Sequence, residues 1–319
     1  MEKWAWLEPA DGKEENMIYL DHAATTPTAP EARAAMEPYY HKRYGNASTP
    51  YEFGQRSRQA VENARTVIAD TLGVQPSEIY FTSGGTESDN WALKSTMEAY
   101  AYKGKHMITT QIEHHAIGNT CEYLRKRGFE VTELPVDREG RISMEELERA
   151  IRPDTVLLSI MCANNEIGTL QDMETIGGIA QRRGIIFHTD AVQAYGQIPI
   201  DVKKWHVHML SASSHKFYGP KGCGFLYMKQ GLRTESMIHG GAQESGRRAG
   251  TENVPGIVGM AKAAQIAFYH MDETMERETW MRDRMIHHIC SEIPGAFLVG
   301  SLTERLPGNL NICFPGIQA

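Results

Sequence analysis

Lys216 stands in "SASSHKFYGPKG", where an apolar run has just ended. A lysine in such a place either packs its stem and reaches solvent with its ammonium, or is a desolvated amine with a lowered pKa. An amine of the second kind attacks carbonyl groups and forms a Schiff base. Asp190, which ends "GIIFHTD", poses a similar choice, because a buried carboxylate must be paired or hydrogen-bonded. It could cap the segment that follows or pair with a cationic ring nitrogen.

A glycine-rich turn offers an anion site. The segment "SGGTES" at residues 83–88 leads into a helical pattern. Such a turn presents free backbone N–H groups and the positive end of a helix dipole to a phosphate. The turn matches neither G-x-G-x-x-G nor G-x-x-x-x-G-K-[ST], so a dinucleotide or a nucleoside triphosphate is disfavoured.

The elements that must position these residues are strands ending side by side. Between residues 56 and 230, β-rich apolar runs alternate with helical patterns. This alternation predicts an α/β fold, with a mainly parallel sheet between helices. Ligands of open α/β sheets bind beyond the carboxyl ends of the strands. The polar groups expected there, in one pocket, are residues 83–86, 113–115, 164–166, 190–193 and 213–216.

Each of these groups has a structural explanation when it is taken alone. Together, a phosphate turn, an aspartate, a lysine and a histidine at adjacent strand ends are what pyridoxal 5′-phosphate (PLP) requires. Lys221, which follows a Gly-Pro pair, is instead predicted to lie on the surface of the turn.

The chain resembles the cysteine desulfurases of the NifS/IscS type, class-V aminotransferase-like enzymes of PLP fold type I. From residue 19 to 255 the resemblance follows the family's order, and "RLPGNLNICFPGIQA" continues it to the end. It rests on "YLDHAATTP", "FTSGGTESDN", "IEHHA", "ANNEIGT", "FHTDAVQAYGQIPIDV", "SSHKFYGPKGCG" and "GGAQESGRRAGTENVP". "IEHHA", "ANNEIGT" and "RRAGTENVP" favour this branch over the SufS-like one.

The resemblance implies a large PLP-binding domain with a seven-stranded sheet and a smaller, incomplete α+β domain. We assign residues 18–256 to the large domain, and residues 1–17 and 257–319 to the small one. The boundary follows Pro255, where one long helical pattern begins that is too long for a typical globular helix without a kink.

The resemblance also assigns roles residue by residue. Lys216 should hold PLP covalently and then move protons at the substrate Cα. Asp190 should pair with the pyridine nitrogen, and His114 should stack on the ring and serve as an acid–base group. The other assignments are Gln193 to the phenolic oxygen, Asn165 to the substrate carboxylate, and Gly85, Thr86, Ser213 and His215 to the phosphate. In a homodimer, Thr251 should reach the phosphate of the partner subunit. Arg247 and Arg248 should lie near the entrance, without an assigned role.

The implied reaction converts L-cysteine to L-alanine and passes the sulfur to an enzyme persulfide, for iron–sulfur cluster or thiolation pathways. In the family, the nucleophilic cysteine lies in a Ser/Gly-rich loop beyond the last matched segment, and an arginine for the substrate carboxylate follows it. This sequence reaches Ala319 before both. Its own cysteines are predicted to be packing residues: Cys121, Cys162, Cys223, Cys290 and Cys313. The chain is therefore predicted to bind PLP without delivering sulfur.

Two alternatives remain open. One is another PLP lyase or aminotransferase of this fold that uses no nucleophilic thiol. The other is a catalytically dead, PLP-binding dimer that serves as a scaffold. For the leading hypothesis, a sulfur-acceptor protein is the expected partner.

Composition bears on other classes of protein. The 319 residues are 41% hydrophobic and 23% charged, as in soluble globular proteins. The net charge of −7, with scattered basic residues, argues against nucleic acid as a partner. No apolar run reaches the roughly 18 residues that span a bilayer, and the N-terminus lacks a signal peptide's apolar segment, so a cytoplasmic location is expected. The spacing of histidines and cysteines predicts no metal site.

Overall fold

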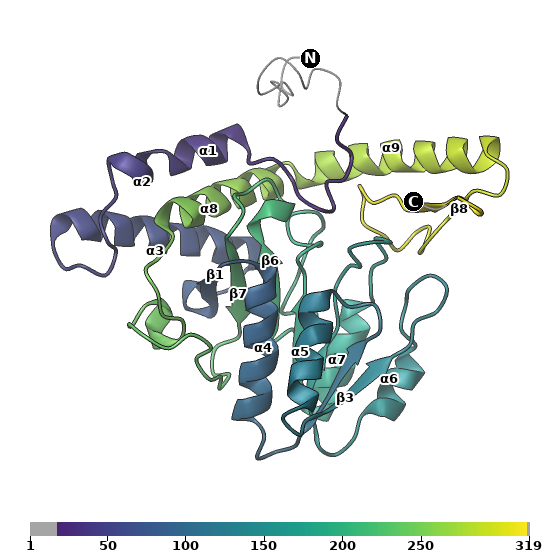
Figure 1. The fold of residues 1–319 in the computed structure, drawn as a ribbon, viewed down its shortest axis with the longest axis horizontal. Coiled ribbons are helices and arrows are strands. Elements are labelled where there is room, and N and C mark those ends of the chain that lie inside the picture. The colour runs from purple at the N-terminus through teal and green to yellow at the C-terminus, as the bar shows by residue number, and fades with distance from the viewer. Residues whose placement is uncertain (1–17, 318–319) are drawn as a thin grey trace.

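The fold centres on one seven-stranded sheet in the order β1-β7-β6-β5-β4-β2-β3. The structure is a computed structural model that describes residues 18–317 (Figure 1). Only β7 runs antiparallel to its neighbours, so the predicted α/β fold with a mainly parallel sheet is confirmed. The strands are β1 (Ile79–Thr82), β2 (His106–Thr110), β3 (Glu130–Leu134), β4 (Thr155–Ser159), β5 (Ile186–Asp190), β6 (Met209–Ser213) and β7 (Gly224–Met228).

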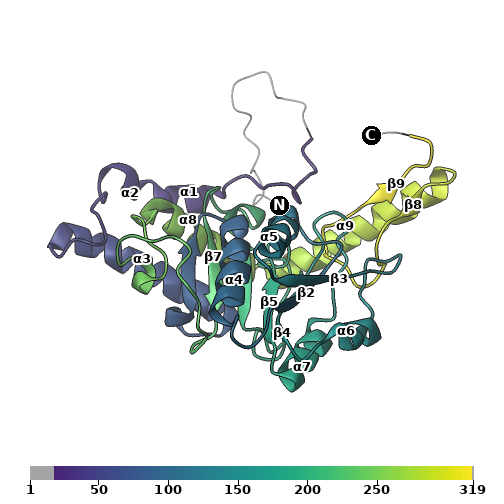
Figure 2. The ribbon, with the colours of Figure 1, turned by 60° about the horizontal axis from the view of Figure 1, so that its bottom comes forward.

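Helices cover both faces of this sheet (Figure 2). One face carries α4 (Gly85–Ala99) and α5 (His115–Arg125). The other carries α3 (Glu52–Leu72), α6 (Met144–Ala150), α7 (Met173–Arg183) and α8 (Val254–Tyr269). At the start of α6, the Ser143 hydroxyl accepts a hydrogen bond from the backbone N–H of Glu146 at 3.3 Å, as the S-x-x-E pattern predicts.

The alternation of side chains along each strand divides the core into two clusters. On β5, Ile186 belongs to the cluster under α4 and α5, whereas Phe187 belongs to the cluster under α3, α7 and α8. Every residue of β2, β4, β5 and β6 is buried. Strands that are covered on both faces consist of near-continuous apolar runs. The polar residues at their ends therefore stand out in the sequence.

The long helical pattern after Pro255 is interrupted at His270, where the backbone leaves α-helical geometry (φ −104°, ψ 10°). The first part is α8, which packs against α1 (Pro30–Met36) and α3 and also contacts α2 (Pro38–His41). The second part is α9 (Met271–Glu292), followed by the antiparallel pair β8 (Phe297–Leu298) and β9 (Ile312–Cys313). The division into domains at residue 256 stays a prediction, and its first piece, residues 1–17, lies outside the described residues.

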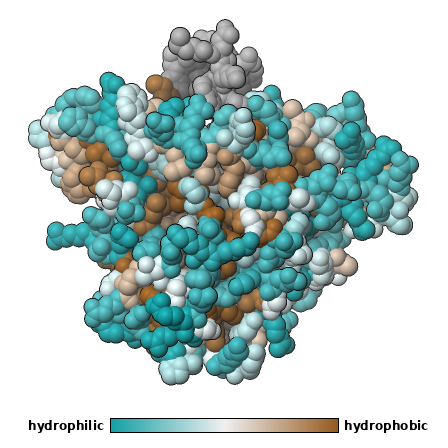
Figure 3. Space-filling view, turned by 180° about the vertical axis from the view of Figure 1, so that it is seen from behind, coloured by the Kyte–Doolittle hydropathy of each residue, from teal (hydrophilic) through white to brown (hydrophobic). Residues whose placement is uncertain are grey.

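The described surface is mixed in polarity. On the face seen in Figure 3, hydrophilic side chains surround separate apolar patches. Among residues 18–317, no helix combines the length and apolar character that crossing a membrane requires.

Candidate active site

Lys216 follows β6 in the short 3₁₀-helix η2 (Ser214–Lys216). Its Nζ donates hydrogen bonds to the backbone carbonyls of Ala23 and, at 2.8 Å, of Ala24. Burial lowers the pKa of Lys216, although nearby carboxylates, Asp190 among them, act in the opposite direction. The environment suits a desolvated amine rather than a solvated surface lysine.

The segment at residues 21–26 holds this lysine turn from the other side. The backbone N–H and the hydroxyl of Thr26 both donate to the carbonyl of His215, at 2.9 Å each. The Thr25 hydroxyl lies 3.0 Å from Nδ1 of His215, and Tyr218 N donates to Thr26 Oγ1 at 2.8 Å. Sequence reasoning assigned no site residue in this segment, because contacts across about 190 residues leave no local pattern.

Asp190 ends β5 with 5% of its surface exposed. Its Oδ1 accepts a hydrogen bond from the backbone N–H of Val192 at 2.9 Å, so it does cap the following turn. Burial raises the pKa of Asp190, while this hydrogen bond and the charges of His114 and Lys216 lower it. One carboxyl group therefore fits both roles that the sequence suggested.

The glycine turn between β1 and α4 borders a cavity of about 400 Å³. Gly84 has φ 148°, which side-chain-bearing residues rarely adopt, and a Cβ on Gly85 would lie 2.5 Å from Val192 Cγ2. Lys221 is exposed in its turn, as predicted, and it also lines this cavity. Burial, followed by the charges of Lys216 and Lys221, lowers the pKa of His215 to about 4. The lining residues are Thr25, Ser83, Gly84, Gly85, Thr86, Glu87, Ser213, His215, Lys221 and Gly222.

The other predicted site residues lie at neighbouring strand ends and do not line this cavity. Gln193 Nε2 donates to the carbonyl of Ala23 at 2.9 Å, which brings it to the same backbone segment as Lys216. His114 caps α5, and its Nδ1 accepts from the backbone N–H of Ala116 at 3.1 Å. Nε2 is therefore the nitrogen of His114 left for a ligand. Asn165 is half-buried and donates to the Glu166 carboxylate at 2.7 Å.

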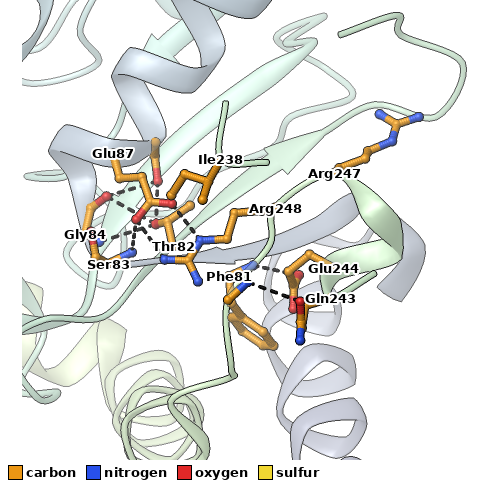
Figure 4. Close-up of polar contacts among 12 residues, drawn as sticks. Phe81, Thr82, Ser83, Gly84, Glu87, Ile238, Gln243, Glu244, Arg247 and Arg248 are labelled. Atoms are coloured by element: carbon orange, nitrogen blue, oxygen red, sulfur yellow. Dashed lines mark hydrogen bonds and ion pairs between the residues drawn. The ribbon is translucent and has the colours of Figure 1, made fainter. Parts of the chain in front are cut away.

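An ion pair joins the glycine turn to the loop that follows β7 (Figure 4). Glu87 accepts a hydrogen bond from the backbone N–H of Ser83 at 2.7 Å. It also accepts two from the guanidinium of Arg248, at 2.8 and 3.1 Å. Arg248, which the sequence left without a role, therefore holds the turn in place.

A second ion pair anchors the same loop and was not foreseen. Glu244 accepts two hydrogen bonds from Arg65, at 2.7 and 2.8 Å, and one from the backbone N–H of Phe81 at 2.9 Å. Its partners lie more than 160 residues away in the chain. The only signal in the sequence is a glutamate in a short polar loop.

Thr251 is exposed and lines a smaller cavity, of about 120 Å³, together with Ser83, Cys223 and Glu252. It is not among the lining residues of the cavity at the glycine turn of its own chain. Its assignment to the site of a partner subunit stays a prediction.

None of the cysteines in the described residues lines the cavity at the glycine turn, although Cys223 follows its lining residue Gly222 and lines the smaller cavity. Cys121, Cys162 and Cys223 are buried, and burial raises the pKa of each thiol to about 12. Cys290 in α9 and Cys313 in β9 are half-buried. In the part of the chain that the structure describes, no cluster of His, Cys, Asp and Glu could hold a metal ion.

The parallel sheet, with a glycine turn, an aspartate and a lysine at the ends of β1, β5 and β6, is the architecture of fold-type-I PLP enzymes. The model of the family "Aminotransferase class-V" matches residues 18–319. The cysteine desulfurase IscS of Methanosarcina thermophila is 52% identical over 305 residues, which are 96% of this chain and 75% of that relative.

Solved structures agree with the sequence relatives. A NifS-like protein superposes with a TM-score of 0.92 at 40% identity, covering 95% of this chain and 83% of its own. SspA in complex with cysteine gives a TM-score of 0.76 at 43% identity, covering 78% of this chain and 72% of its own. The chain belongs to the class-V aminotransferase family, and within it to the NifS/IscS group of cysteine desulfurases.

Proposed function

We propose that this chain binds PLP and L-cysteine in the site of a cysteine desulfurase. The complete reaction releases L-alanine and passes the sulfur to an enzyme thiol, which becomes a persulfide, and the described residues place no such thiol in the lining of the cavity. The observation that carries the proposal is the placement of a buried carboxylate, Asp190, and a desolvated amine, Lys216, at the ends of neighbouring strands beside a glycine turn. The named activity of the IscS relative, and the complex that SspA forms with cysteine, support the choice of substrate.

The residues present fit PLP on chemical grounds. A carboxylate that is 5% exposed, such as that of Asp190, requires a hydrogen-bonded or cationic partner, and a protonated pyridine nitrogen is one. At the other end of the site, the turn at Gly84 and Gly85 forms a cradle that side chains would fill. Its backbone N–H groups at the start of α4 suit a phosphate.

When bound, PLP supplies an electron sink for bond cleavage at the Cα of an amino acid. Lys216 is the residue that holds the cofactor, and its amine then takes up and returns the proton at Cα. Asp190 keeps the ring nitrogen protonated, and Gln193 hydrogen-bonds to the phenolic oxygen. His114 stacks on the ring and uses its free Nε2 as an acid–base group.

The phosphate is held from several elements at once. His215, whose pKa is about 4, is a neutral donor there at neutral pH. In a homodimer, Thr251 of the partner subunit completes the phosphate site. Asn165 binds the substrate carboxylate. The other phosphate ligands are Gly85, Thr86 and Ser213.

The proposal extends to organisation and partners. Residues 18–256 form the PLP-binding domain, and residues 1–17 with 257–319 form the smaller one. The chain forms a homodimer in the cytoplasm, and a form that also carries the family's nucleophilic cysteine would pass sulfur to an acceptor protein for iron–sulfur cluster assembly or thiolation.

Borohydride trapping tests the first part of this proposal. After incubation with PLP and reduction, peptide mass spectrometry should find the cofactor on Lys216. The Lys216→Ala variant should carry no cofactor. The Lys221→Ala variant should still be labelled on Lys216, because Lys221 lines the proposed phosphate cavity but does not hold the cofactor covalently. Labelling of another lysine in the wild-type chain, or no labelling at all, would refute the assignment.

A cysteine assay tests the reaction. On adding cysteine and a reductant, the absorbance of the bound cofactor should change. The 319-residue chain should release no catalytic amounts of sulfide and alanine. None of its described cysteines lines the cavity, and the three buried thiols, Cys223 among them, have a pKa raised to about 12. Rapid alanine formation would contradict this expectation and direct attention to Cys313 and Cys121. Transfer of the amino group to a keto acid would favour the alternative of an aminotransferase. Unchanged absorbance of the bound cofactor on adding cysteine would favour the alternative of a catalytically dead scaffold.

A further inference from the structure

Asp89 is a buried acid that the proposed mechanism does not use. It lies in α4 and is 1% exposed. Gly85, Asp89, Ala92 and Thr96 are all buried, and this helical spacing places them on the side of α4 that covers the sheet. An ionised carboxylate in such a position needs a partner.

Strand alternation identifies the groups that face Asp89. Ile186 of β5 belongs to the cluster under α4, so His188 and Asp190, at spacings of two, point to the same face. On β6, Ser211 stands directly opposite Asp190 in the ladder. Asp89 therefore meets one imidazole, one hydroxyl and one carboxylate. Glu113, whose carboxyl is enclosed after β2, also raises the pKa of Asp89.

His188 does not supply a positive charge to Asp89. Its Nε2 lies 3.7 Å from Asp89 Oδ1, beyond hydrogen-bond distance. Both ring nitrogens already have closer partners, Ser159 Oγ at 2.9 Å and Ser211 Oγ at 3.0 Å. Burial lowers the pKa of His188 to about 3, so the ring is neutral at physiological pH.

Asp89 interacts with two polar side chains besides His188: a hydrogen bond with Ser211 lowers its pKa, and a hydrogen bond with the carboxyl group of Asp190 raises it. A hydrogen bond between two carboxyl groups requires a proton on one of them. Asp190 is the better site for the negative charge, because it accepts the N–H of Val192 and lies near the charge of Lys216. Burial, followed by the charge of Asp190, raises the pKa of Asp89 well above its usual range. Burial also raises the pKa of Glu113 to about 8, so this third enclosed acid is mostly protonated at neutral pH.

We infer that Asp89 is a positioning residue: as a neutral carboxylic acid it donates a hydrogen bond to the carboxylate of Asp190, which keeps Asp190 ionised and oriented toward the ligand. The proton on Asp89 is a property of the chain without any ligand. The effect of its hydrogen bond on cofactor binding rests on the proposed function. An amide at position 89 could replace the acid, since it also donates a hydrogen bond without carrying charge.

Infrared spectroscopy of the apo-protein, with ¹³C in the aspartate carboxyl groups only, tests where the proton lies. Wild type at pH 7 should give the carbonyl band of a protonated aspartic acid. The band should vanish in Asp89→Asn and persist in Asp70→Asn, which removes an exposed aspartate of α3 as a control. Glu113 carries no label and cannot contribute. Absence of the band in wild type, or a ¹⁵N spectrum that shows His188 as an imidazolium at pH 7, would overturn the inference.

Cofactor titration tests what the hydrogen bond does. The measured quantity is the pH at the midpoint of the absorbance change of the bound cofactor. In Asp89→Asn this pH should stay close to that of wild type. Asp89→Ala should shift this pH by about one to two units, which corresponds to the loss of a hydrogen bond to a charged group. An unshifted midpoint in Asp89→Ala would overturn the positioning role. If wild type fails to bind PLP, the proposed function falls, but the infrared result still decides the protonation of Asp89.

Discussion

Breaking the buried ion pair between Arg65 and Glu244 on one side only should strongly destabilise the site loop. The two side chains are 11% and 3% exposed and share two hydrogen bonds at 2.7 and 2.8 Å. Burial alone would lower the pKa of Arg65, but the hydrogen bonds and charge of Glu244 raise it above its ordinary value. Replacing Glu244 by alanine leaves this guanidinium buried and removes the acceptor of Phe81 N.

The expected cost follows from these contacts. Removing one partner of a buried ion pair costs about 3–5 kcal/mol. Glu62 lies 3.3 Å from Arg65 and is half exposed. Its carboxylate still neutralises part of the Arg65 charge when Glu244 is removed, so we expect a cost at the lower end of that range. We expect Glu244→Ala to reduce the free energy of unfolding by about 3 kcal/mol. Replacing Arg65 and Glu244 together by methionine should recover most of this loss, since no buried charge is then left unpaired.

Urea unfolding, followed by circular dichroism and tryptophan fluorescence, measures these differences. The matched control is Glu145→Ala, which breaks a pair with Arg149 at 3.3 Å whose side chains are 83% and 67% exposed. Exposed pairs contribute less than about 1 kcal/mol. Equal losses for Glu244→Ala and Glu145→Ala would refute the argument from burial. A double variant no more stable than Glu244→Ala would show that packing, rather than the stranded charge, causes the loss.

Three further changes test the site. Arg248→Lys keeps the charge but loses the two-pronged contact with Glu87, so PLP should bind about tenfold more weakly in a fluorescence titration, the equivalent of one hydrogen bond to a charged group. An unchanged affinity for PLP would show that the ion pair between Arg248 and Glu87 does not hold the glycine turn in its binding conformation. Gly85→Ala should abolish PLP binding in the same assay because its Cβ meets Val192 Cγ2 at 2.5 Å, and adding Val192→Ala should restore it. Burial raises the pKa of Glu113 to about 8, so the folded chain keeps a proton that the unfolded chain releases above its ordinary pKa. Stability from this group is present at acidic pH and falls by up to about 1.4 kcal/mol per pH unit between about pH 4.5 and 8, and chemical unfolding across that range should show a flatter profile for Glu113→Gln.

The order of strands and helices could be predicted because the central strands are buried on both faces. Their apolar runs end abruptly in polar residues such as Asp190 and Ser213. The order of strands in the sheet left no such signal. β1 pairs with β7, and this contact depends on packing between segments far apart in the chain. The sequence likewise predicted that the helical pattern after Pro255 is too long without a kink, but not that the break falls at His270.

The candidate site was predictable where its residues end strands, and not where distant segments meet. Ala23 and Thr25 contact Lys216 and His215 only through the folded structure. Asp89 is an intermediate case. Helical spacing from Gly85 places it on the covered face of its helix, where an acidic side chain is unusual enough to be noticed. Identifying its partner required the alternation of β5, which the sequence alone does not align with α4.

Helix α4 connects the two ends of the site, and this explains why the two acids near its start, Glu87 and Asp89, are enclosed, whereas Glu98 near its end is exposed. Glu87, in the first turn, holds the backbone N–H of Ser83 and the guanidinium of Arg248 at the phosphate end. Its negative charge there is favoured by the helix dipole. Asp89, two residues later, faces the sheet and interacts with Asp190, the proposed partner of the ring nitrogen. Because both acids belong to one rigid helix that packs on β6 and β7, the spacing between the phosphate turn and Asp190 is set by the helix rather than by loops. A ligand that bridges the two ends must match that spacing, so α4 selects for ligand length as well as charge.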